Sequence, residues 1–481
     1  MEALERALSA RGLTVSWIPG KGRGLIAARD FSPGNVIISQ EPFASSPSKF
    51  SSGSSCDRCF TSSNLRKCSG CRIVWYCGTG CQKLEWKLHR LECKAFAALS
   101  EDREKMLTPT VRLMAKLVLR RKLQNDLTFG FTSYYHLCFI VHLSHQDMSD
   151  LDEKQLILYA QMANLVKLVL PSLDIDLKEV AQNFSKISCN AHTICDSELR
   201  PLGTGLYPII SIINHSCIPN SVLVFEGQVA FVRALEPIKA GAEVMISYIE
   251  TAATTNTRQD NLKQYFFTCS CPRCFKELKE DAILEGYRCK DKKCDGFLLH
   301  EVEKKSFTCQ QCGLGRDENE TTKVANEIEE MSKVVTAVLS AGNLSQASSL
   351  YKNFEQLQLN LLHPHSIKLL QTRETLLKVC MELNDWRRAL QYCQLTIPVY
   401  QRVYQSNHPM VGLQYYTCGK LEWLLEKTED ALKSFTEAAN ILRITHGSTS
   451  PFMYELFSRL EEAQAEASYK RSALGERMIT D

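Results

Sequence analysis

Residues 214–220 read NHSCIPN, and this short stretch decides the fold more than any other in the chain. It places an amide, an imidazole and a thiol within four residues. Further along the chain, residues 269–274 read CSCPRC, and their three thiols leave a tetrahedral metal site one ligand short. Cys217 is the natural fourth ligand. We therefore predict a zinc ion held by Cys217, Cys269, Cys271 and Cys274.

Two more segments gain meaning beside this stretch. Residues 20–25 read GKGRGL, and residues 241–248 read GAEVMISY. Taken singly, each is weak, because a glycine-rich turn is usually only a turn and a buried Asn-His pair is usually a satisfied core pair. In this order, and followed by the cysteine block, the three segments resemble the SET domain. Residues 183–250 have a strand-like pattern, with a hairpin predicted from 221–225 and 229–234.

A block of cysteines at residues 56–93 contains four correctly spaced ligand pairs. Eight protein ligands make two closed, structural zinc sites, and a stretch with so little apolar content depends on the metal for its folding energy. The order and spacing resemble the MYND zinc finger, and that resemblance implies interleaved pairs. One ion is then held by Cys56, Cys59, Cys77 and Cys81, and the other by Cys68, Cys71, His89 and Cys93.

A third block has the layout of a zinc ribbon with a looser first spacing, and it consists of Cys289, Cys294, Cys309 and Cys312. The chain holds 21 cysteines, and clustered thiols in a long intracellular chain bind metal more often than they form disulfides. We expect an intracellular chain because no apolar stretch approaches the roughly 20 residues that span a bilayer. The N-terminus also lacks the apolar region of a secretory signal.

From about residue 320 the sequence is helical and repetitive. Ala347, Ala389 and Ala431 are 42 residues apart, and a histidine-containing turn follows each of them. The fixed interval favours helix-turn-helix repeats, which bury their faces by stacking, over a generic helical bundle. Because this tail carries no candidate catalytic residue, we expect it to be separable from the catalytic part.

Together these features resemble the SET and MYND domain family of protein-lysine methyltransferases, in particular its plant-type members with a tetratricopeptide-like tail. The resemblance implies an α+β multidomain protein. The expected segments are an N-terminal SET segment (1–50), a MYND zinc finger (56–93), a helical SET insert (95–180), the SET core (181–250), a post-SET zinc site (251–275), a zinc ribbon (285–315) and an all-α helical-repeat domain (320–481).

The resemblance also implies an S-adenosylmethionine site. The matching cofactor-binding residues are Lys21, Gly22, Arg23, Cys189, Asn190, Ser211, Asn214, His215, Tyr248 and Phe267. Among them, the Asn214 side chain is expected to bond the methionine part of the cofactor, and Phe267 to stack on its adenine. Tyr248 matches the catalytic tyrosine, with a strand-end core tyrosine as the alternative, and Tyr265 matches the second tyrosine of the lysine channel. His192 stands where relatives often carry phenylalanine, so it bears on the degree of methylation.

The implied reaction passes a methyl group from a sulfonium cation to a neutral lysine amine by in-line displacement. It is mainly a positioning task, helped by oxygen dipoles aligned around the methyl group, and no metal takes part in it. The implied substrate is a lysine of a histone tail or of a non-histone protein. The implied location is the nucleus, with the cytoplasm also open, and no membrane partner is expected.

Two questions about partners stay open in the sequence. The MYND resemblance implies proline-containing peptide partners. Basic side chains in the same block leave weak nucleic-acid contact open, although a solvated charged face explains them more simply, and the net charge of +3 predicts no strong binding. The rival hypothesis for the whole chain is a catalytically silent scaffold that recruits chromatin partners. The presence of Asn214, His215, Tyr248 and Phe267 argues against it.

Overall fold

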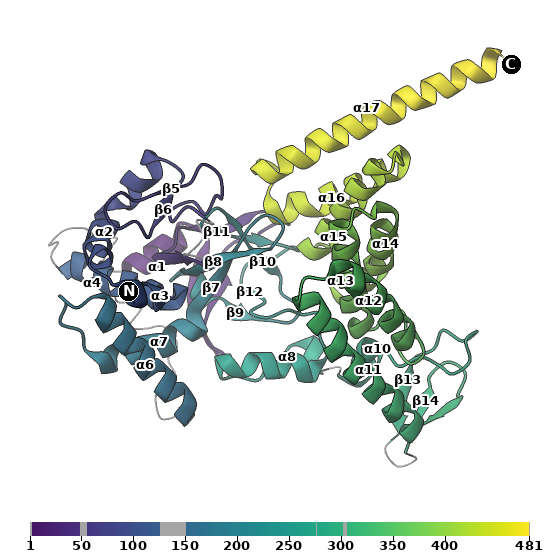
Figure 1. Cartoon of the computed structure of the whole chain (residues 1–481), viewed down its shortest axis with the longest axis horizontal. Helices are drawn as coiled ribbons and strands as arrows, with labels where there is room; N and C mark the ends of the chain where they lie inside the picture. Colours follow the sequence, from purple (N-terminus) through teal and green to yellow (C-terminus); the bar gives the residue numbers. More distant parts are fainter. Residues whose placement is uncertain (1, 49–54, 126–150, 276, 302–304, 481) are drawn as a thin grey trace. The chain divides into compact units, whose positions relative to one another are not determined.

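The computed structural model describes residues 2–48, 55–125, 151–275, 277–301 and 305–480. The chain forms two compact units, which Figure 1 shows with their element labels. Unit 1 comprises Met1–His215, Pro219–Ile246 and Lys263–Phe267, and unit 2 comprises Ser216–Ile218, Ser247–Leu262 and Thr268–Asp481. Within the described helices, none is long and apolar enough to cross a membrane.

The central sheet of unit 1 assembles segments that are far apart in the sequence. Its strands are β1 (Leu13–Ile18), β2 (Gly22–Ala27), β12 (Glu243–Ile246) and β9 (Asn214–His215), in the order β1-β2-β12-β9. Strand β12 pairs antiparallel with β2 on one side and parallel with β9 on the other. The three segments that resemble the SET domain are therefore neighbours in one sheet.

Unit 1 has two further three-stranded sheets, besides the small two-stranded sheet of β5 (Arg66–Lys67) and β6 (Trp75–Tyr76). Their orders are β10-β11-β3 and β4-β8-β7, with β3 at Val36–Gln40, β4 at Ala44–Pro47, β7 at Ala191–Cys195, β8 at Pro201–Leu206, β10 at Ser221–Glu226 and β11 at Val229–Ala234. The predicted hairpin is confirmed, and Gly227 takes the positive φ of 60° that its tight turn requires. The sequence after Gly241 also predicts a strand over Val244–Tyr248; in the structure this strand is β12, which ends two residues earlier, at Ile246.

Helices cover the rest of unit 1. They are α1 (Glu2–Ser9), α2 (Thr79–Ala97), α3 (Glu101–Lys105), α4 (Pro109–Asn125), α6 (Glu153–Val169), α7 (Leu177–Asn190) and the short η2 (Ile210–Ile212) and η3 (Lys263–Tyr265), with β5 (Arg66–Lys67) and β6 (Trp75–Tyr76) before α2. In α4, Val111, Met114 and Leu117 recur at helical spacing and are buried. Asp176 precedes α7 as its N-cap, and its carboxylate accepts the first free backbone N–H groups. Because α7 continues to Asn190, the strand-like pattern expected from residue 183 is wrong up to that residue, and the first strand there begins at Ala191.

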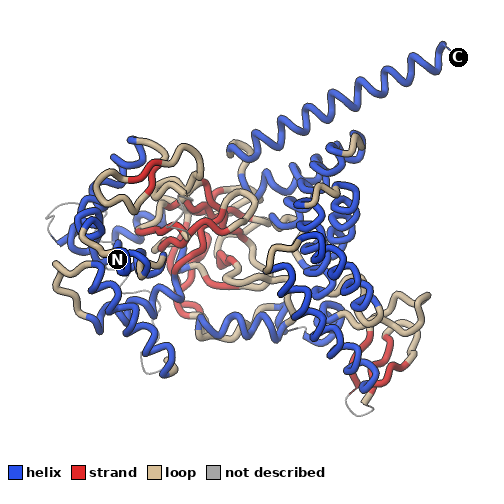
Figure 2. The backbone as a smooth tube through the Cα atoms, in the orientation of Figure 1, coloured by secondary structure: helices blue, strands red, loops and turns tan. Residues whose placement is uncertain are grey.

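Unit 2 begins with short elements around two cysteine blocks. Helices α8 (Thr255–Leu262), α9 (Pro272–Phe275) and α10 (Glu277–Glu285) precede an antiparallel sheet of β13 (Leu298–Glu301), β14 (Ser306–Cys309) and β15 (Gly315–Asp317). This small sheet, drawn in red in Figure 2, carries the ribbon cysteine Cys309 at the end of β14, opposite Leu298 of β13.

Between Glu318 and Thr480 the chain is purely helical. The helices are α11 (Glu318–Ser340), α12 (Leu344–Leu359), α13 (Ile367–Glu382), α14 (Trp386–Val403), α15 (Pro409–Leu424), α16 (Thr428–His446) and α17 (Pro451–Thr480), and consecutive helices pack together. Ala347, Ala389 and Ala431 each occupy the fourth position of their helix and are fully buried. The equivalence supports the repeat interpretation. One expected turn is displaced, since His446 ends α16 and the turn begins at Gly447.

Candidate active site and metal centres

Glu243 joins the three segments of the central sheet. Its Oε2 accepts a hydrogen bond from Lys21 Nζ at 2.6 Å, and its Oε1 accepts one from Asn214 Nδ2 at 2.9 Å. The second N–H of the same amide donates to the Arg23 backbone oxygen at 3.1 Å. The Glu243 side chain is only 13% exposed. Its carboxylate is therefore a partly desolvated link between the three sequence segments of the central sheet. Sequence reasoning quoted Glu243 but gave it no role, because its role lies in contacts between distant segments.

Asn220 reinforces the same junction. Its Nδ2 donates to the Glu243 backbone oxygen at 2.7 Å, and its Oδ1 accepts from the Met245 N–H at 2.8 Å. Ser221 Oγ donates to the Met245 oxygen at 2.8 Å. These side chains hydrogen-bond to backbone groups of Glu243 and Met245 within β12, and so attach the strand to the segment that follows β9. Asn220 was quoted as part of the motif; its adjacent Ser221 was missed, since a serine there carries no distinctive sequence signal.

The turn before β2 has the features of a close-approach surface. Gly22 has φ of 79°, and no described residue comes within 4 Å of the position of a β-carbon there. Gly24 differs, because a β-carbon would lie 2.8 Å from Asn214 Nδ2. Burial lowers the pKa of Arg23, although a guanidinium remains charged at neutral pH. The turn therefore presents bare backbone and two cationic side chains, those of Lys21 and Arg23.

An aromatic pair lies close to this sheet within unit 1. The rings of His215 and Phe267 have centroids 5.9 Å apart and are tilted by 51°. Phe267 follows Phe266, which has a φ of 60°, an uncommon value for a bulky residue. Such a conformation persists only where the surroundings hold it. The structure thus turns the chain sharply between Tyr265 and Phe267, the two predicted site aromatics.

The end of α7 brings three other predicted residues into one neighbourhood. Ser211 Oγ lies 2.8 Å from the Asn190 oxygen, and Cys189 Sγ lies 3.5 Å from the Gln264 oxygen beside Tyr265. Burial and the nearby Cys189 thiol raise the pKa of Tyr265. Burial also raises the pKa of Cys189. Both groups are therefore neutral at physiological pH, and Ser211 uses its hydroxyl proton within the chain.

His192 lies on β7, opposite Gly205 of β8. Its ring meets the Tyr207 ring edge-on at 6.1 Å, and its Nε2 is shielded from solvent with no hydrogen-bond partner among the described residues. Burial lowers the pKa of His192 to about 4. The imidazole is therefore neutral at physiological pH.

Tyr248 follows β12 by two residues and belongs to unit 2 with the rest of Ser247–Leu262. It is half-buried. The backbone around it is braced locally, because Ser247 Oγ donates to the Ile249 oxygen at 2.7 Å. The other predicted site residues described above lie in unit 1.

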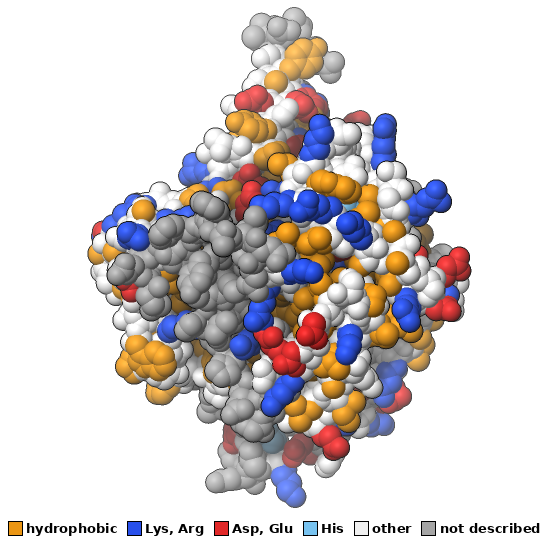
Figure 3. Space-filling view, turned by 90° about the vertical axis from the view of Figure 1, so that its left-hand side faces the viewer, with side chains coloured by type: hydrophobic (Ala, Val, Ile, Leu, Met, Phe, Trp, Pro, Cys, Tyr) orange, Lys and Arg blue, Asp and Glu red, His pale blue; other side chains and the backbone are white. Residues whose placement is uncertain are grey.

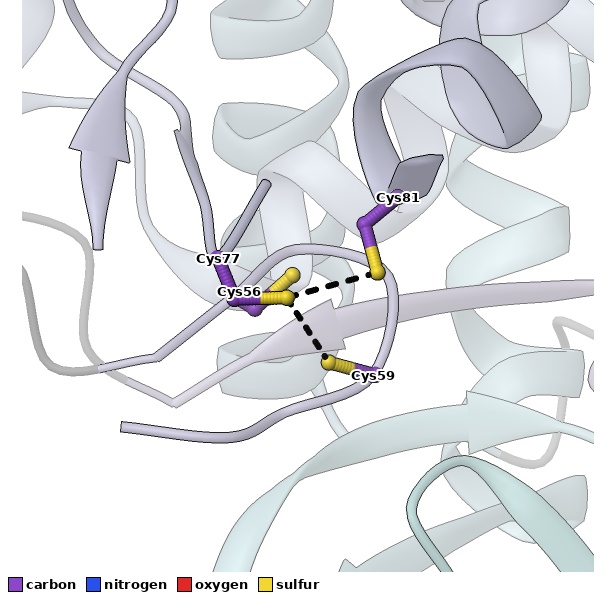
Figure 4. Close-up of side chains that lie close together, drawn as sticks. All are labelled: Cys56, Cys59, Cys77 and Cys81. Carbon is purple, nitrogen blue, oxygen red and sulfur yellow. Dashed lines mark hydrogen bonds between the residues drawn. The ribbon is translucent and has the colours of Figure 1, made fainter. Parts of the chain in front are cut away.

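The first predicted metal centre is assembled from a loop, a strand end and a helix start. Cys56 and Cys59 come from the loop before β5, Cys77 follows β6, and Cys81 lies in the first turn of α2 (Figure 4). The Cys59 and Cys77 sulfurs are 3.6 Å apart, and those of Cys77 and Cys81 3.5 Å. A tetrahedral ion with Zn–S bonds of about 2.3 Å sets its sulfurs about 3.8 Å apart. These free thiols fit that spacing.

The second finger centre groups Cys68, Cys71, His89 and Cys93. His89 Nε2 lies 3.7 Å from Cys71 Sγ, while its Nδ1 lies 2.9 Å from Glu92 Oε2. A carboxylate on the far ring nitrogen fixes the tautomer and orientation of a metal-binding histidine. The structure therefore groups the ligands in the interleaved order that the resemblance implies.

Buried charges continue from this centre into α4. Arg112 Nη2 donates to Glu92 Oε2 at 2.8 Å and to Asp57 Oδ2 at 3.0 Å. Lys116 Nζ donates to the same Asp57 oxygen and to the Ser45 backbone oxygen, both at 3.0 Å. Arg112 is fully buried. The finger and the helical insert thus share one buried ionic network. No pattern in the sequence predicts these contacts.

The remaining two centres lie in unit 2. Cys217 Sγ lies 3.9 Å from Cys269 Sγ and 3.6 Å from Cys274 Sγ, and Cys271 completes the group. The ribbon group is similar, with 3.5 Å between the Cys289 and Cys312 sulfurs and 3.7 Å between those of Cys294 and Cys309. Each of the four predicted ligand sets is therefore brought together.

Comparison with known proteins agrees with this geometry. A SET domain model matches residues 22–249. Histone-lysine N-methyltransferase ASHR1 of Arabidopsis thaliana is 54% identical over 98% of this chain and 100% of its own length. N-lysine methyltransferase SMYD2 of Homo sapiens is 30% identical, covering 95% of this chain and 99% of its own. The chain therefore belongs to the SET-domain family of histone- and protein-lysine N-methyltransferases.

Proposed function

We propose that this enzyme transfers a methyl group from S-adenosylmethionine to a lysine amine of a protein, with a histone as its substrate class. The observation that carries the proposal is the convergence of three distant segments on Glu243, which holds Lys21 and Asn214 together. The histone preference rests on the Arabidopsis relative, which is named as a histone-lysine N-methyltransferase.

The residues present fit the cofactor. S-adenosylmethionine supplies an electrophilic methyl group on a sulfonium sulfur. Lys21 and Arg23 suit its carboxylate, and Asn214, whose two amide N–H groups are used within the chain, offers Oδ1 to its ammonium group. The Phe267 ring and the His215 backbone suit the adenine. Each proposed contact pairs a donor with an acceptor or an apolar face with a ring.

Tyr248 and Tyr265 are proposed to line the lysine channel and direct their hydroxyl dipoles toward the reacting atoms. The target amine must be neutral to attack, forming its bond to the methyl carbon as the carbon–sulfur bond breaks. Since the pKa of His192 is about 4, this residue adds no positive charge beside an amine that must shed its proton. A phenolic hydroxyl that acts mainly in the transition state affects turnover more than ground-state binding.

Calorimetry with S-adenosylmethionine, followed by transfer of a radiolabelled methyl group to histone octamers, tests the proposal. We expect binding and labelling by the wild-type enzyme. The Tyr248→Phe variant should lose turnover by about 100-fold or more while its cofactor Kd stays within about threefold. A protein that neither binds the cofactor nor labels histones or nuclear extract would instead be the silent scaffold.

We further propose that the four cysteine clusters each hold one Zn²⁺. Three consist of four cysteines and one of three cysteines and a histidine, which are ligand sets of structural zinc sites. Elemental analysis of the folded, reduced enzyme should find close to four zinc ions per chain. Loss of the ribbon ion alone should follow Cys294→Ser, with the other three retained.

A nuclear location and proline-containing peptide partners for the MYND finger complete the proposal. The finger leaves Leu84 and Trp86 of α2 exposed, and apolar side chains of this kind suit proline rings. On the face drawn in Figure 3, Lys and Arg side chains lie among acidic and apolar ones. That mixture supports a protein partner over a nucleic acid, which needs a concentrated basic surface.

A further inference from the structure

The segment that follows Tyr248 is held by the helical tail. Tyr404, at the end of α14, donates its hydroxyl to Glu250 Oε1 at 2.8 Å. Two residues on, Ala252 packs against the apolar cluster of α13–α16 that contains Val399 and Val403. The Thr255 N–H then donates to the Asp281 carboxylate of α10 at 2.8 Å. All of these residues belong to unit 2.

Tyr404 is itself rigidly placed. It is only 8% exposed, and its ring stacks on His408 with centroids 4.3 Å apart and an angle of 11°. Glu250 Oε1 also accepts the Ala252 N–H at 2.7 Å. Although Glu250 is exposed, its carboxylate is therefore held from two sides, and the tyrosine that holds it has little freedom to move.

The opposite end of the segment is tied to the post-SET cysteine cluster. Arg258 Nη2 donates to Thr255 Oγ1 at 3.0 Å and lies 3.6 Å from Cys274 Sγ. Gln259 Nε2 donates to the Cys269 backbone oxygen at 2.8 Å. The residues between Tyr248 and α8 thus span two anchors, a tyrosine of the tail and a cysteine cluster.

We infer that Tyr404 is a positioning residue for catalysis, which fixes Tyr248 by holding Glu250 two residues further along the chain. The inference rests on the proposed role of Tyr248. A single residue, Ile249, separates the anchored Glu250 from Tyr248, and the Ser247 hydroxyl donates to the backbone oxygen of that residue. A displacement of Glu250 therefore carries over to the Tyr248 hydroxyl, where misplacement of a reacting group by a fraction of an ångström is costly.

The Tyr404→Phe variant tests this, because it keeps the ring and removes only the hydroxyl. Tyr392→Phe is a matched control: Tyr392 lies in the same helix, is also 8% exposed, and donates its hydroxyl to Glu355 of α12 at 3.3 Å, which is not part of the Tyr248 segment. We expect kcat to fall about five- to tenfold in Tyr404→Phe and less than about twofold in Tyr392→Phe. The Kd for S-adenosylmethionine should change less than about twofold in both.

Substitutions of Glu250 test the same contact from its other side. Glu250→Gln keeps an oxygen acceptor for the Tyr404 hydroxyl and should retain most of the turnover, whereas Glu250→Ala should resemble Tyr404→Phe. The double variant Tyr404→Phe/Glu250→Ala should be no slower than Glu250→Ala alone, since both changes remove the same contact. If the kcat losses of the two single variants multiply in the double variant, the two residues act independently, and the inference is overturned.

Amide hydrogen exchange gives a readout that needs no activity. Peptides covering 247–253 should exchange faster in Tyr404→Phe than in Tyr392→Phe. If the enzyme labels no substrate at all, the proposed function fails while the exchange arm still measures the anchoring. If the wild type turns over and the two tyrosine variants match in both kcat and exchange, the positioning role is wrong and the proposed function stands.

Discussion

Glu243 connects the three sequence motifs, because its carboxylate accepts hydrogen bonds from both Lys21 and Asn214. Removing its carboxylate in Glu243→Ala leaves Lys21 and one Asn214 N–H without their partner, and both side chains are then free to leave the cofactor turn. We expect the Kd for S-adenosylmethionine to rise about tenfold, because a lost hydrogen bond to a charged group costs about 1.5–3 kcal/mol in part-buried surroundings. Calorimetry measures the change.

The control for that substitution is Glu243→Gln, which keeps an acceptor for Asn214 and removes only the ion pair with Lys21. Since Lys21 is 38% exposed, solvent screens the pair and Glu243→Gln should bind the cofactor within about threefold of wild type. Equal losses in the two variants would assign the effect to the charge instead of the hydrogen bond.

His408 gives the enzyme a pH-dependent stability. Burial lowers its pKa to about 4 in the folded chain, so the unfolded chain takes up a proton first as pH falls below about 6.5. Stability attributable to His408 is therefore present above that pH and is lost progressively from about pH 6.5 to 4. His408→Asn keeps an acceptor for the Met410 N–H. Between pH 7 and pH 5, its free energy of unfolding should fall by about 1–2 kcal/mol less than that of the wild type. Denaturant titrations at the two pH values show whether the two proteins differ in this slope.

At the residue scale, the identity of the functional side chains can be predicted from the sequence more completely than their contacts can. The metal ligands follow from fixed spacings, which is why each predicted set is grouped in space. The role of Glu243 could not be predicted, because it depends on the register between β12 and two strands far away in the sequence. The same holds for Tyr404, which reads as an ordinary core tyrosine of a repeat.

At the scale of elements, the finger and the helical insert are joined by buried charge. Arg112 of α4 faces Asp57 and Glu92, so Arg112→Met leaves two buried carboxylates short of their cation. Loss of one partner from a buried ionic network costs about 3–5 kcal/mol. Arg121→Met on the same helix removes an exposed pair with Glu179 and should cost less than about 1 kcal/mol. Thermal unfolding of the two variants at equal zinc content provides the comparison, and similar losses would show that the buried network is not stabilising.

Periodicity and turn residues predict most elements and their order. The hairpin of β10 and β11 and the buried face of α4 follow from local patterns. The parallel pairing of β9 with β12 does not, because parallel neighbours are joined by long connections whose partner cannot be read locally. The strand before Tyr248 ends two residues earlier than predicted, since β12 stops at Ile246.

At the scale of the whole molecule, the separability of tail and catalytic part stays a prediction, and two contacts of the segment after Tyr248 argue against it: Ala252 packs against the tail helices, and Tyr404 donates to Glu250. We predict that deleting 318–481 lowers turnover about ten- to a hundredfold on a short peptide as well as on a folded histone substrate. Full zinc occupancy of the finger and a folded circular dichroism spectrum must first be shown for the truncated chain. Unchanged peptide turnover would restore the tail to a purely substrate-recognising role.

The sheet order β1-β2-β12-β9 also determines the order in which parts of the chain can fold during synthesis. Lys21 and its partner Glu243 are 222 residues apart, so at ribosomal rates of about 5–20 residues per second β2 waits about ten to forty seconds for β12. During that interval the zinc finger, whose eight ligands all lie before residue 94, can already close around its ions. With the proposed zinc ions bound, the finger therefore forms before the central sheet is complete, and the edge of β2 stays open to chaperones until the second half of the SET domain leaves the ribosome.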